Sequence, residues 1–325
     1  MTAAPPGAVL HSIGTNTAAP RIARTLEAAQ SLHSKTSALC ESPGVEQLES
    51  SRTAWRELYL SWSHQQAVMF GPGREQGLRR HLFSWPTHAM IINAVLEPGV
   101  AEDVALNRHV RGLPAVEFML FGDQKMPVEA GMFEHAGRCA HLDDIMSEVV
   151  KRIGAHADVW TNGFGDGFVA KNSPDSEVSR LSMLLAEALN TVDDILWQRL
   201  GGPAGLYGGI VQTEDLDAWR SGETLAGLEA SLVTINDIVS GAGPEQPGIA
   251  NLLANRNSDA ASDLVRSTRD AVAIAREIEG PLAGAILDRP GTVKDLYAAV
   301  QDVQNYLIVT SEQLELAVEF EKDGD

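Results

Sequence analysis

Helical periodicity runs through almost the whole chain, and it is the feature that most restricts the possible folds. In residues 133–160 the apolar side chains recur every three or four positions, as they do in a helix that buries one face. The segments 258–287 and 292–320 repeat the pattern. Few segments alternate apolar and polar residues, and no Asn-Gly or Asp-Gly turn separates two such runs. The sequence therefore predicts an all-α fold.

Further helices are expected at about 20–39, 46–69, 87–97, 114–121, 177–199 and 214–240. Residues 161–178 carry three glycines and a proline. Ser176, near the end of this segment, is a good helix N-cap. We interpret this segment as a linker between two four-helix-bundle-like domains, at 21–160 and 179–325. The Ala/Pro/Thr-rich residues 1–20 read as a flexible leader.

The charge balance excludes some classes of partner. The 325 residues include 25 basic and 44 acidic side chains, a formal charge of −19. A surface of this sign repels phosphate backbones, so nucleic acid is not expected as a partner, and an anionic membrane surface is also disfavoured. A cationic ligand or a metal ion remains possible.

The chain also lacks membrane and secretion signals. It contains no run of 18 apolar residues, so no transmembrane helix is predicted. The first 20 residues have neither a basic region nor an apolar core, so they are not an intact signal peptide. A removed N-terminal segment could still have served as a membrane tether.

Known catalytic signatures are absent from the sequence. It has no HExxH helix, GxSxG elbow, CxxC pair or EF-hand loop. The glycine-rich stretch 201–209 matches neither the P-loop nor the dinucleotide pattern, so we interpret it as a loop between helices. The spacing of the nine histidines gives no metal-binding pair on one helix face. Two cysteines, Cys40 and Cys139, allow one disulfide or two buried thiols.

One short apolar segment contains an isolated charge. Residues 111–122 read RGLPAVEFMLFG, and Pro114 suits the first turn of a helix that would end near Gly122. Glu117 is the only charge within the apolar part of this helix. A carboxylate in such surroundings is paired, bound to a metal, or shifted toward its neutral form. One interpretation is a buried Glu that ties two helices together.

This segment resembles the GxHxxE signature of imelysin-like proteins, the insulin-cleaving membrane protease group. Matches in the same order extend over about 270 residues, and the GLPAVE form is similar to a subgroup with GLPALE. The other matching pieces are Trp55, Phe70-Gly71-Pro72, Ser84-Trp85-Pro86, Ala218-Trp219-Arg220-Ser221-Gly222, Thr224-Leu225 and the C-terminal Asp323-Gly324-Asp325.

The resemblance implies two helical bundles with a pocket between them, a periplasmic or envelope-attached location, and a link to iron or haem acquisition. Gly112 and Glu117 match the ends of the motif, and Arg220 with Ser221 matches an arginine-serine pair from the other half. An Arg220 facing Glu117 would be the partner that a buried carboxylate needs. The resemblance also implies a disulfide between Cys40 and Cys139.

Pro114 stands where the motif has its histidine, and proline offers no side-chain ligand. A hydrolytic zinc or iron centre normally needs about three protein ligands. Only Glu117 remains from the motif, and His109 or His88 would have to be recruited. Iron or zinc is therefore possible as a cofactor, but the motif makes peptidase activity doubtful.

We consider three hypotheses for the function. The first is a non-catalytic envelope protein that binds a small ligand, a metal complex or a partner protein in a polar pocket between the bundles. The second is a metallopeptidase that uses Glu117 as ligand or general base. The third is an envelope scaffold whose polar cluster only sets the domain geometry. The residues expected in the pocket are Gly112, Glu117, Arg220, Ser221, Trp85 and Trp55.

Overall fold

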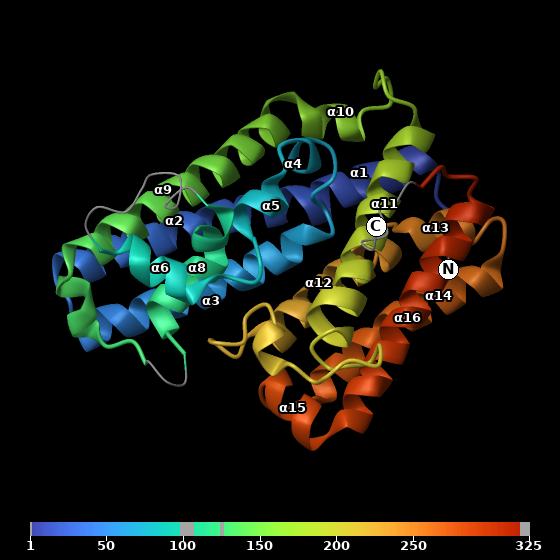
Figure 1. The fold of residues 1–325 in the computed structure, drawn as a ribbon. Coiled ribbons are helices and arrows are strands. Elements are labelled where there is room, and N and C mark those ends of the chain that lie inside the picture. The colour runs from blue at the N-terminus through green and yellow to red at the C-terminus, as the bar shows by residue number, and fades with distance from the viewer. Residues whose placement is uncertain (1, 98–106, 124–126, 319–325) are drawn as a thin grey trace.

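A computed structural model describes residues 2–97, 107–123 and 127–318. Within these ranges the chain forms helices and no strand, so the predicted all-α class is confirmed. Two groups of helices lie at an angle to each other (Figure 1). None of the helices in the described ranges is long and apolar enough to cross a membrane.

The first group of helices comes from the first half of the chain. Its long helices α2 and α3 pack along each other, and α9 packs against α2. The short helix α8 contacts both α3 and α9. The bounds of its helices are α2 Ala19–Glu41, α3 Val45–Gln66, α4 Pro72–Glu75, α5 Leu78–Leu82, α6 Ala89–Val95, α8 Gly112–Phe121 and α9 Ala136–Val159.

The second group comes from the second half, where α14 packs against both α12 and α16, and α11 packs against α16. Its bounds are α11 Glu177–Asp194, α12 Thr224–Ser240, α13 Ile249–Leu253, α14 Ser258–Glu277, α15 Leu282–Asp288 and α16 Pro290–Gln313. A π-helical segment, η5 (Ile195–Gly201), continues α11. Two bundle-like groups of helices are thus present, as predicted.

Two predicted helices begin or end elsewhere in the structure. The segment expected to be helical from 214 forms the end of a 3-10 helix, η6 (Thr213–Asp215), and then turns until α12 begins at Thr224, with Gly222 at a φ of +79°. The segment 258–287 is divided at Gly280, which has a φ of +75° and precedes Pro281. These conformations interrupt a helix even where the apolar spacing continues.

The prediction that residues 1–20 form a flexible leader is wrong. Residues Pro6–Ile13 form helix α1, and a π-helical turn, η1 (Gly14–Ala18), joins it to α2. Val9, Leu10 and Ile13 are fully buried, because α1 packs against α11 and α13 of the second group. The composition of these residues favoured flexibility, but burial of their apolar face stabilises the helix.

The expected linker also has structure of its own. Helix α9 is followed by the π-helical turn η4 (Trp160–Phe164) and the short helix α10 (Gly165–Val169). Ser176 then caps α11, since its hydroxyl accepts a hydrogen bond from the N–H of Ser179 at 3.0 Å. The domain boundaries themselves stay a prediction.

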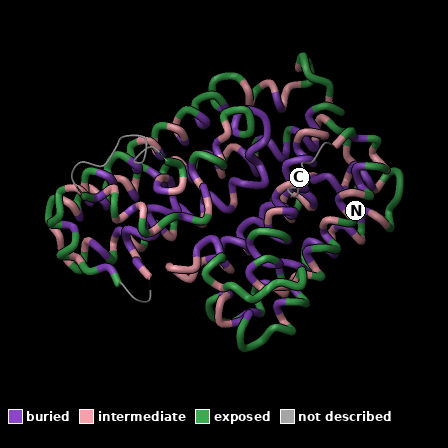
Figure 2. Tube along the Cα trace, viewed as in Figure 1, coloured by how far each residue is buried: buried purple, intermediate pink, exposed green. Residues whose placement is uncertain are grey.

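Each of the two groups of helices has a buried interior. Figure 2 shows buried residues along the inward sides of the helices in both groups. One hydrophobic cluster is built from residues between Ala28 and Ile153, with Ala218 added from the second half. The other combines the second half with residues 9–22, 67–70 and 157–168. Each apolar cluster therefore includes residues from both halves of the chain, which holds the two groups together.

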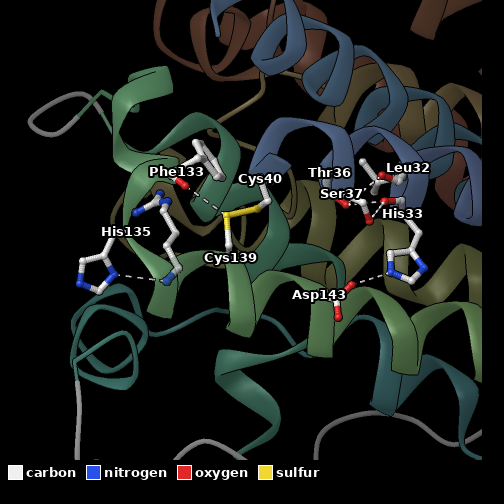
Figure 3. The surroundings of a disulfide bond; sticks show 10 residues. Leu32, His33, Thr36, Ser37, Cys40, Phe133, His135, Cys139 and Asp143 are labelled. Carbon is white, nitrogen blue, oxygen red and sulfur yellow. Dashed lines mark hydrogen bonds and ion pairs between the residues drawn. A yellow bond between two sulfur atoms is a disulfide. The ribbon is translucent and has the colours of Figure 1, made fainter. Parts of the chain in front are cut away.

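A disulfide joins Cys40, at the end of α2, to Cys139, in the first turn of α9. Figure 3 shows the bond bridging these two helices, with Phe133 beside it. The pairing implied by the family resemblance is therefore present, and it links elements that are 99 residues apart in sequence.

Candidate functional site

Helix α8 brings Glu117 into the interior of the molecule. The helix begins at Gly112, whose φ of +77° favours glycine, and a Cβ there would lie 2.5 Å from the carbonyl oxygen of Leu82. Pro114 occupies the first turn as predicted. Every residue from Gly112 to Leu120 is buried, and Glu117 has no exposed surface. Gly112 therefore allows the close packing that buries the carboxylate.

The direct partner of Glu117 is Ser221. Its Oε1 accepts hydrogen bonds from the backbone N–H of Ser221 at 2.9 Å and from the Ser221 hydroxyl at 2.8 Å. Oε2 is buried and has no hydrogen-bond partner among the described residues. Burial raises the pKa of Glu117 to about 7, against the lowering effect of the Ser221 hydrogen bonds and the Arg220 charge. The carboxylate thus links α8 to the turn before α12.

Arg220 does not take the role expected for it. It lies close enough to influence the Glu117 charge, but the hydrogen bonds to the carboxylate come from Ser221. Its guanidinium carbon lies 4.6 Å from the Trp219 ring centre and 5.3 Å from that of Phe118. Nε and Nη1 are buried, and neither has a hydrogen-bond partner in the part of the chain that the structure describes. Arg220 is therefore held by aromatic faces.

The two tryptophans expected at the site lie in different environments. Trp55 is fully buried, stacks on Tyr59 with 5.2 Å between ring centres, and donates a hydrogen bond to the carbonyl of Leu113 at 3.1 Å. Trp85 is partly exposed, and its indole N–H donates to the carbonyl of Asp215 at 2.9 Å. Trp55 is therefore a core residue, and Trp85 links a loop of the first group to the second.

A cavity of about 620 Å³ lies between the two groups of helices. The first group contributes one wall of the cavity, from the end of α3 through the loop that carries Trp85, together with Arg108 and His109. The second group contributes the other wall, from α11, η5 and the turn that carries Asp217. The lining residues are Gln66, Met69, Gly73, Arg74, Gly77, Leu78, Arg79, Arg80, Phe83, Ser84, Trp85, Arg108, His109, Glu187, Asn190, Asp193, Asp194, Gln198, Arg199 and Asp217.

Of the residues expected in the pocket, only Trp85 lines this cavity, together with His109 from the metal hypothesis. The four others of the motif and its partners (Gly112, Glu117, Arg220 and Ser221) lie outside the lining, as does Trp55. Glu117 and Arg220 are therefore not among the residues that line this cavity, and their place in a ligand pocket stays a prediction. The motif carboxylate instead holds the turn that contains Asp217, which does line it.

A buried charged cluster contributes to the wall of the cavity. Asp217 Oδ2 accepts a hydrogen bond from the Tyr59 hydroxyl at 2.9 Å and lies 2.9 Å from Arg199 Nε. Arg199 also donates to the Ser231 hydroxyl at 3.1 Å and to the Tyr59 oxygen at 3.1 Å. The side chains of Arg199 and Asp217 are only 5% and 6% exposed. This cluster connects α3, η5, the Asp217 turn and α12.

The cavity is unusually basic for this acidic chain. Five of its lining residues are arginines and four are acidic, a formal charge of 5 − 4 = +1, compared with −19 for the protein. Arg79 forms ion pairs with Asp194 and with Glu187, the latter at 3.4 Å. Arg80 and Arg108 are exposed, and no carboxylate of the described residues pairs with either. The lining is therefore less acidic than the protein as a whole.

Sequence reasoning missed Arg199, Asp217 and Arg79. Arg199 was detectable in principle, because it falls three or four positions after the buried Ile195 and Leu196, on the apolar side of the helix. Asp217 immediately precedes the matched segment Ala218–Gly222 but lies within the region read as a helix. Arg79 gave no local signal. Its role depends on contacts with α11, about 110 residues away.

The residues do not fit a zinc or iron centre. Glu117 has no second ligand from the motif, since Pro114 replaces the histidine, and Ser221 already occupies one of its oxygens. The ring of His109 packs against that of His88 and contacts the carbonyl of Pro86, not Glu117. No group of three or more His, Cys, Asp or Glu residues suited to a metal is found among the described residues.

Two helical bundles with a buried motif carboxylate define an imelysin-like architecture, and the family model for imelysin matches residues 18–309. The chain belongs to the imelysin family. A solved structure of a putative iron-regulated protein A precursor from Parabacteroides distasonis ATCC 8503 is similar, with a TM-score of 0.81 and 15% identity over 95% of this chain and 94% of that one.

An imelysin-like protein from Psychrobacter arcticum 273-4 is also similar, with a TM-score of 0.78 and 19% identity over 98% of this chain and 100% of that one. No curated protein matches the chain. At these identities the two structures support the fold, which they share along nearly its full length.

Proposed function

We propose that the protein is a non-catalytic binding protein of the cell envelope that holds a small anionic ligand, such as a carboxylate-chelated metal ion, in the cavity between its two bundles. The observation that carries this proposal is the concentration of arginines in the cavity lining of a chain with a charge of −19. An anion would be repelled by most of the surface and attracted here.

The size and composition of the cavity support a small ligand. A volume of about 620 Å³ is within the range of small-molecule sites. Its wall combines apolar surface from Met69, Phe83 and Trp85 with hydrogen-bonding groups from Asn190 and Gln198. Such a mixture can exclude water on one side of a ligand and orient it on the other.

Family membership supports the envelope location and the link to iron. The similar protein from Parabacteroides distasonis is named as a putative iron-regulated protein A precursor, and a precursor is processed after synthesis. A disulfide between α2 and α9 suits an oxidising compartment. A chelated metal would enter as cargo with its own ligands, so it would not require a cluster of protein ligands.

The proposal is tested by isothermal titration calorimetry with citrate, ferric citrate and inorganic phosphate. We expect saturable binding of citrate, and the double variant Arg80→Gln/Arg108→Gln should weaken it about tenfold, because each lost charge-assisted contact contributes on the order of 1 kcal/mol or less at exposed positions. The control Arg266→Gln removes an exposed arginine of α14 that lies outside the cavity.

The outcomes separate the hypotheses. Binding of ferric citrate in preference to citrate would support metal-chelate cargo. If none of the three probes binds, or if the double variant binds citrate as well as the wild type does, the proposal is wrong. The scaffold hypothesis would then gain support, because it needs the buried inter-bundle contacts but no ligand.

A further inference from the structure

The arginines and the carboxylates of the cavity lie on opposite walls. The first group of helices contributes four arginines and no acidic residue to the lining, whereas the second group contributes all four acidic residues and one arginine. On the second wall, Arg199 and Asp217 neutralise each other at 2.9 Å. The remaining charged residues are Arg74, Arg79, Arg80 and Arg108 on the first wall and Glu187, Asp193 and Asp194 on the second.

Helix α11 carries the acidic wall. Glu187 and Asp194 are seven residues apart, about two turns of the helix, so both lie on the side of α11 that faces the cavity. Arg79 reaches across from α5 and forms ion pairs with both. Burial raises the pKa of Glu187, against the lowering effect of the Arg79 and Arg74 charges.

The charges at α11 do not cancel. Together with Asp193, the three carboxylates of this helix face Arg74 and Arg79, which gives a formal charge of 2 − 3 = −1. Arg80 and Arg108 add a formal charge of +2 on the first wall, and no carboxylate of the described residues pairs with either. The cavity therefore has a negative part at α11 and a positive part at Arg80 and Arg108.

Asp194 keeps an oxygen available to a ligand. Arg79 pairs with its Oδ2, and Oδ1 accepts no hydrogen bond from any described residue. Oδ1 retains solvent-accessible surface, the side chain is 15% exposed, and Asp194 lines the cavity. A positively charged donor can therefore reach this oxygen from the cavity, and the net negative charge at α11 favours such a donor over a neutral one.

We infer that the cavity selects acidic amino acids, whose two carboxylates bind Arg80 and Arg108 and whose ammonium group donates to Asp194. This inference rests on the proposed function and specifies the chemical class of its ligand. An acidic amino acid carries two negative groups and one positive group, which complement the two parts of the cavity. A plain dicarboxylate satisfies the two arginines but is repelled by α11.

Two matched pairs of acids test the inference on the unmodified protein. Aspartate differs from succinate, and glutamate from glutarate, by one ammonium group in place of hydrogen. Calorimetric titrations should show the amino acid of each pair binding about tenfold more tightly, as expected for one charge-assisted hydrogen bond. Malate, which carries a neutral hydroxyl where aspartate has its ammonium, should bind within about threefold of succinate.

The results distinguish failure of the inference from failure of the proposed function. If the two members of each pair bind within threefold of each other, selection of the ammonium is wrong but anion binding stands. If malate binds as tightly as aspartate, the cavity recognises any hydrogen-bond donor and the inference is overturned. If none of the five acids binds, the proposed function fails as well.

The variant Asp194→Asn connects the preference to this residue. It removes one negative charge at α11 and leaves Arg79 with one carboxylate fewer. The ratio of aspartate to succinate affinity should therefore fall below about threefold, while succinate binds at least as tightly as it does to the wild type. A merely structural role of Asp194 would weaken both acids alike, and a retained ratio would overturn its part in selection.

The control Asp263→Asn removes a carboxylate of α14 that lies outside the cavity, so the ratio should stay at its wild-type value. Both variants change the net charge by the same amount, which separates a local effect from a general one. Helical circular dichroism compares the fold of each variant with that of the wild type. If Asp194→Asn does not fold, the acid pairs on the wild-type protein decide the question alone.

Discussion

At the scale of single residues, Glu117 combines a correct expectation with a wrong one. An isolated carboxylate among apolar neighbours signalled a special environment, and the side chain is fully buried with a raised pKa. The family resemblance placed Ser221 at the same site but suggested Arg220 as the partner. The hydrogen bonds come from Ser221, which lies 104 residues away on a turn that the periodicity presented as helix. The unsatisfied Oε2 shows that the site tolerates a costly group.

The raised pKa makes the stability contribution of Glu117 depend on pH. The folded state binds the proton more tightly than the unfolded state, so stability from this group is complete below pH 4.5 and decreases as the pH rises through about 7. The total loss is about 3 kcal/mol. A glutamine keeps an acceptor for Ser221 and cannot ionise.

We therefore expect the variant Glu117→Gln to gain about 2.5 kcal/mol in unfolding free energy relative to the wild type between pH 5 and pH 8. Urea denaturation followed by circular dichroism at both pH values measures this. Comparing variant and wild type at each pH cancels the contributions of other titrating groups, such as the buried His156, whose pKa is lowered to about 4 by burial. If the unfolding free energies of the two proteins change with pH in the same way, the raised pKa of Glu117 is contradicted.

At the scale of elements, the long helices were predictable and their interruptions were not. The apolar stripes of α2, α3, α9, α14 and α16 are local patterns, and the helices follow them. The turn at 216–223 and the break at Gly280 also carry apolar residues at helical spacing, which masks the interruption even where Gly280-Pro281 can end a helix. The first of these turns holds Asp217, Arg220 and Ser221, the residues that connect the motif to the cavity.

The disulfide between α2 and α9 provides a prediction for these elements. Replacing both cysteines in Cys40→Ala/Cys139→Ala should lower the unfolding free energy by up to about 4 kcal/mol, because the bond closes a long loop in the unfolded chain. Neither cysteine lines the cavity, so citrate affinity should stay unchanged in the folded variant. Equal stability of variant and oxidised wild type, measured by urea denaturation, would show that the bond contributes nothing.

At the scale of the whole molecule, the N-terminal helix joins the two groups. Helix α1 belongs by sequence to the first half, but its apolar side lies in the hydrophobic cluster of the second half, and Figure 1 shows α1 beside α11. The cavity lies between the same two groups. Packing of α1 therefore helps to set the relative position of the surfaces that form the cavity.

Truncating one buried side chain of α1 tests this role. Leu10→Ala should reduce the unfolding free energy by about 2–5 kcal/mol, the usual loss when a fully buried leucine is truncated to alanine. The matched control Leu287→Ala removes a leucine that is 64% exposed and should change stability by less than about 0.5 kcal/mol. If the two variants are equally stable by urea denaturation, residues 6–13 do not contribute to the core in solution.

The sequence by itself determined the all-α class, most of the long helices and the inference that Glu117 lies in an unusual environment. These properties depend on local spacing and on a single residue among its chain neighbours. Only the tertiary structure decided where the cavity lies, that Ser221 partners Glu117, and that Arg199 and Asp217 form a buried pair. The physical reason is that these contacts join segments from residues 59 to 231, and their geometry depends on how whole helices pack against one another.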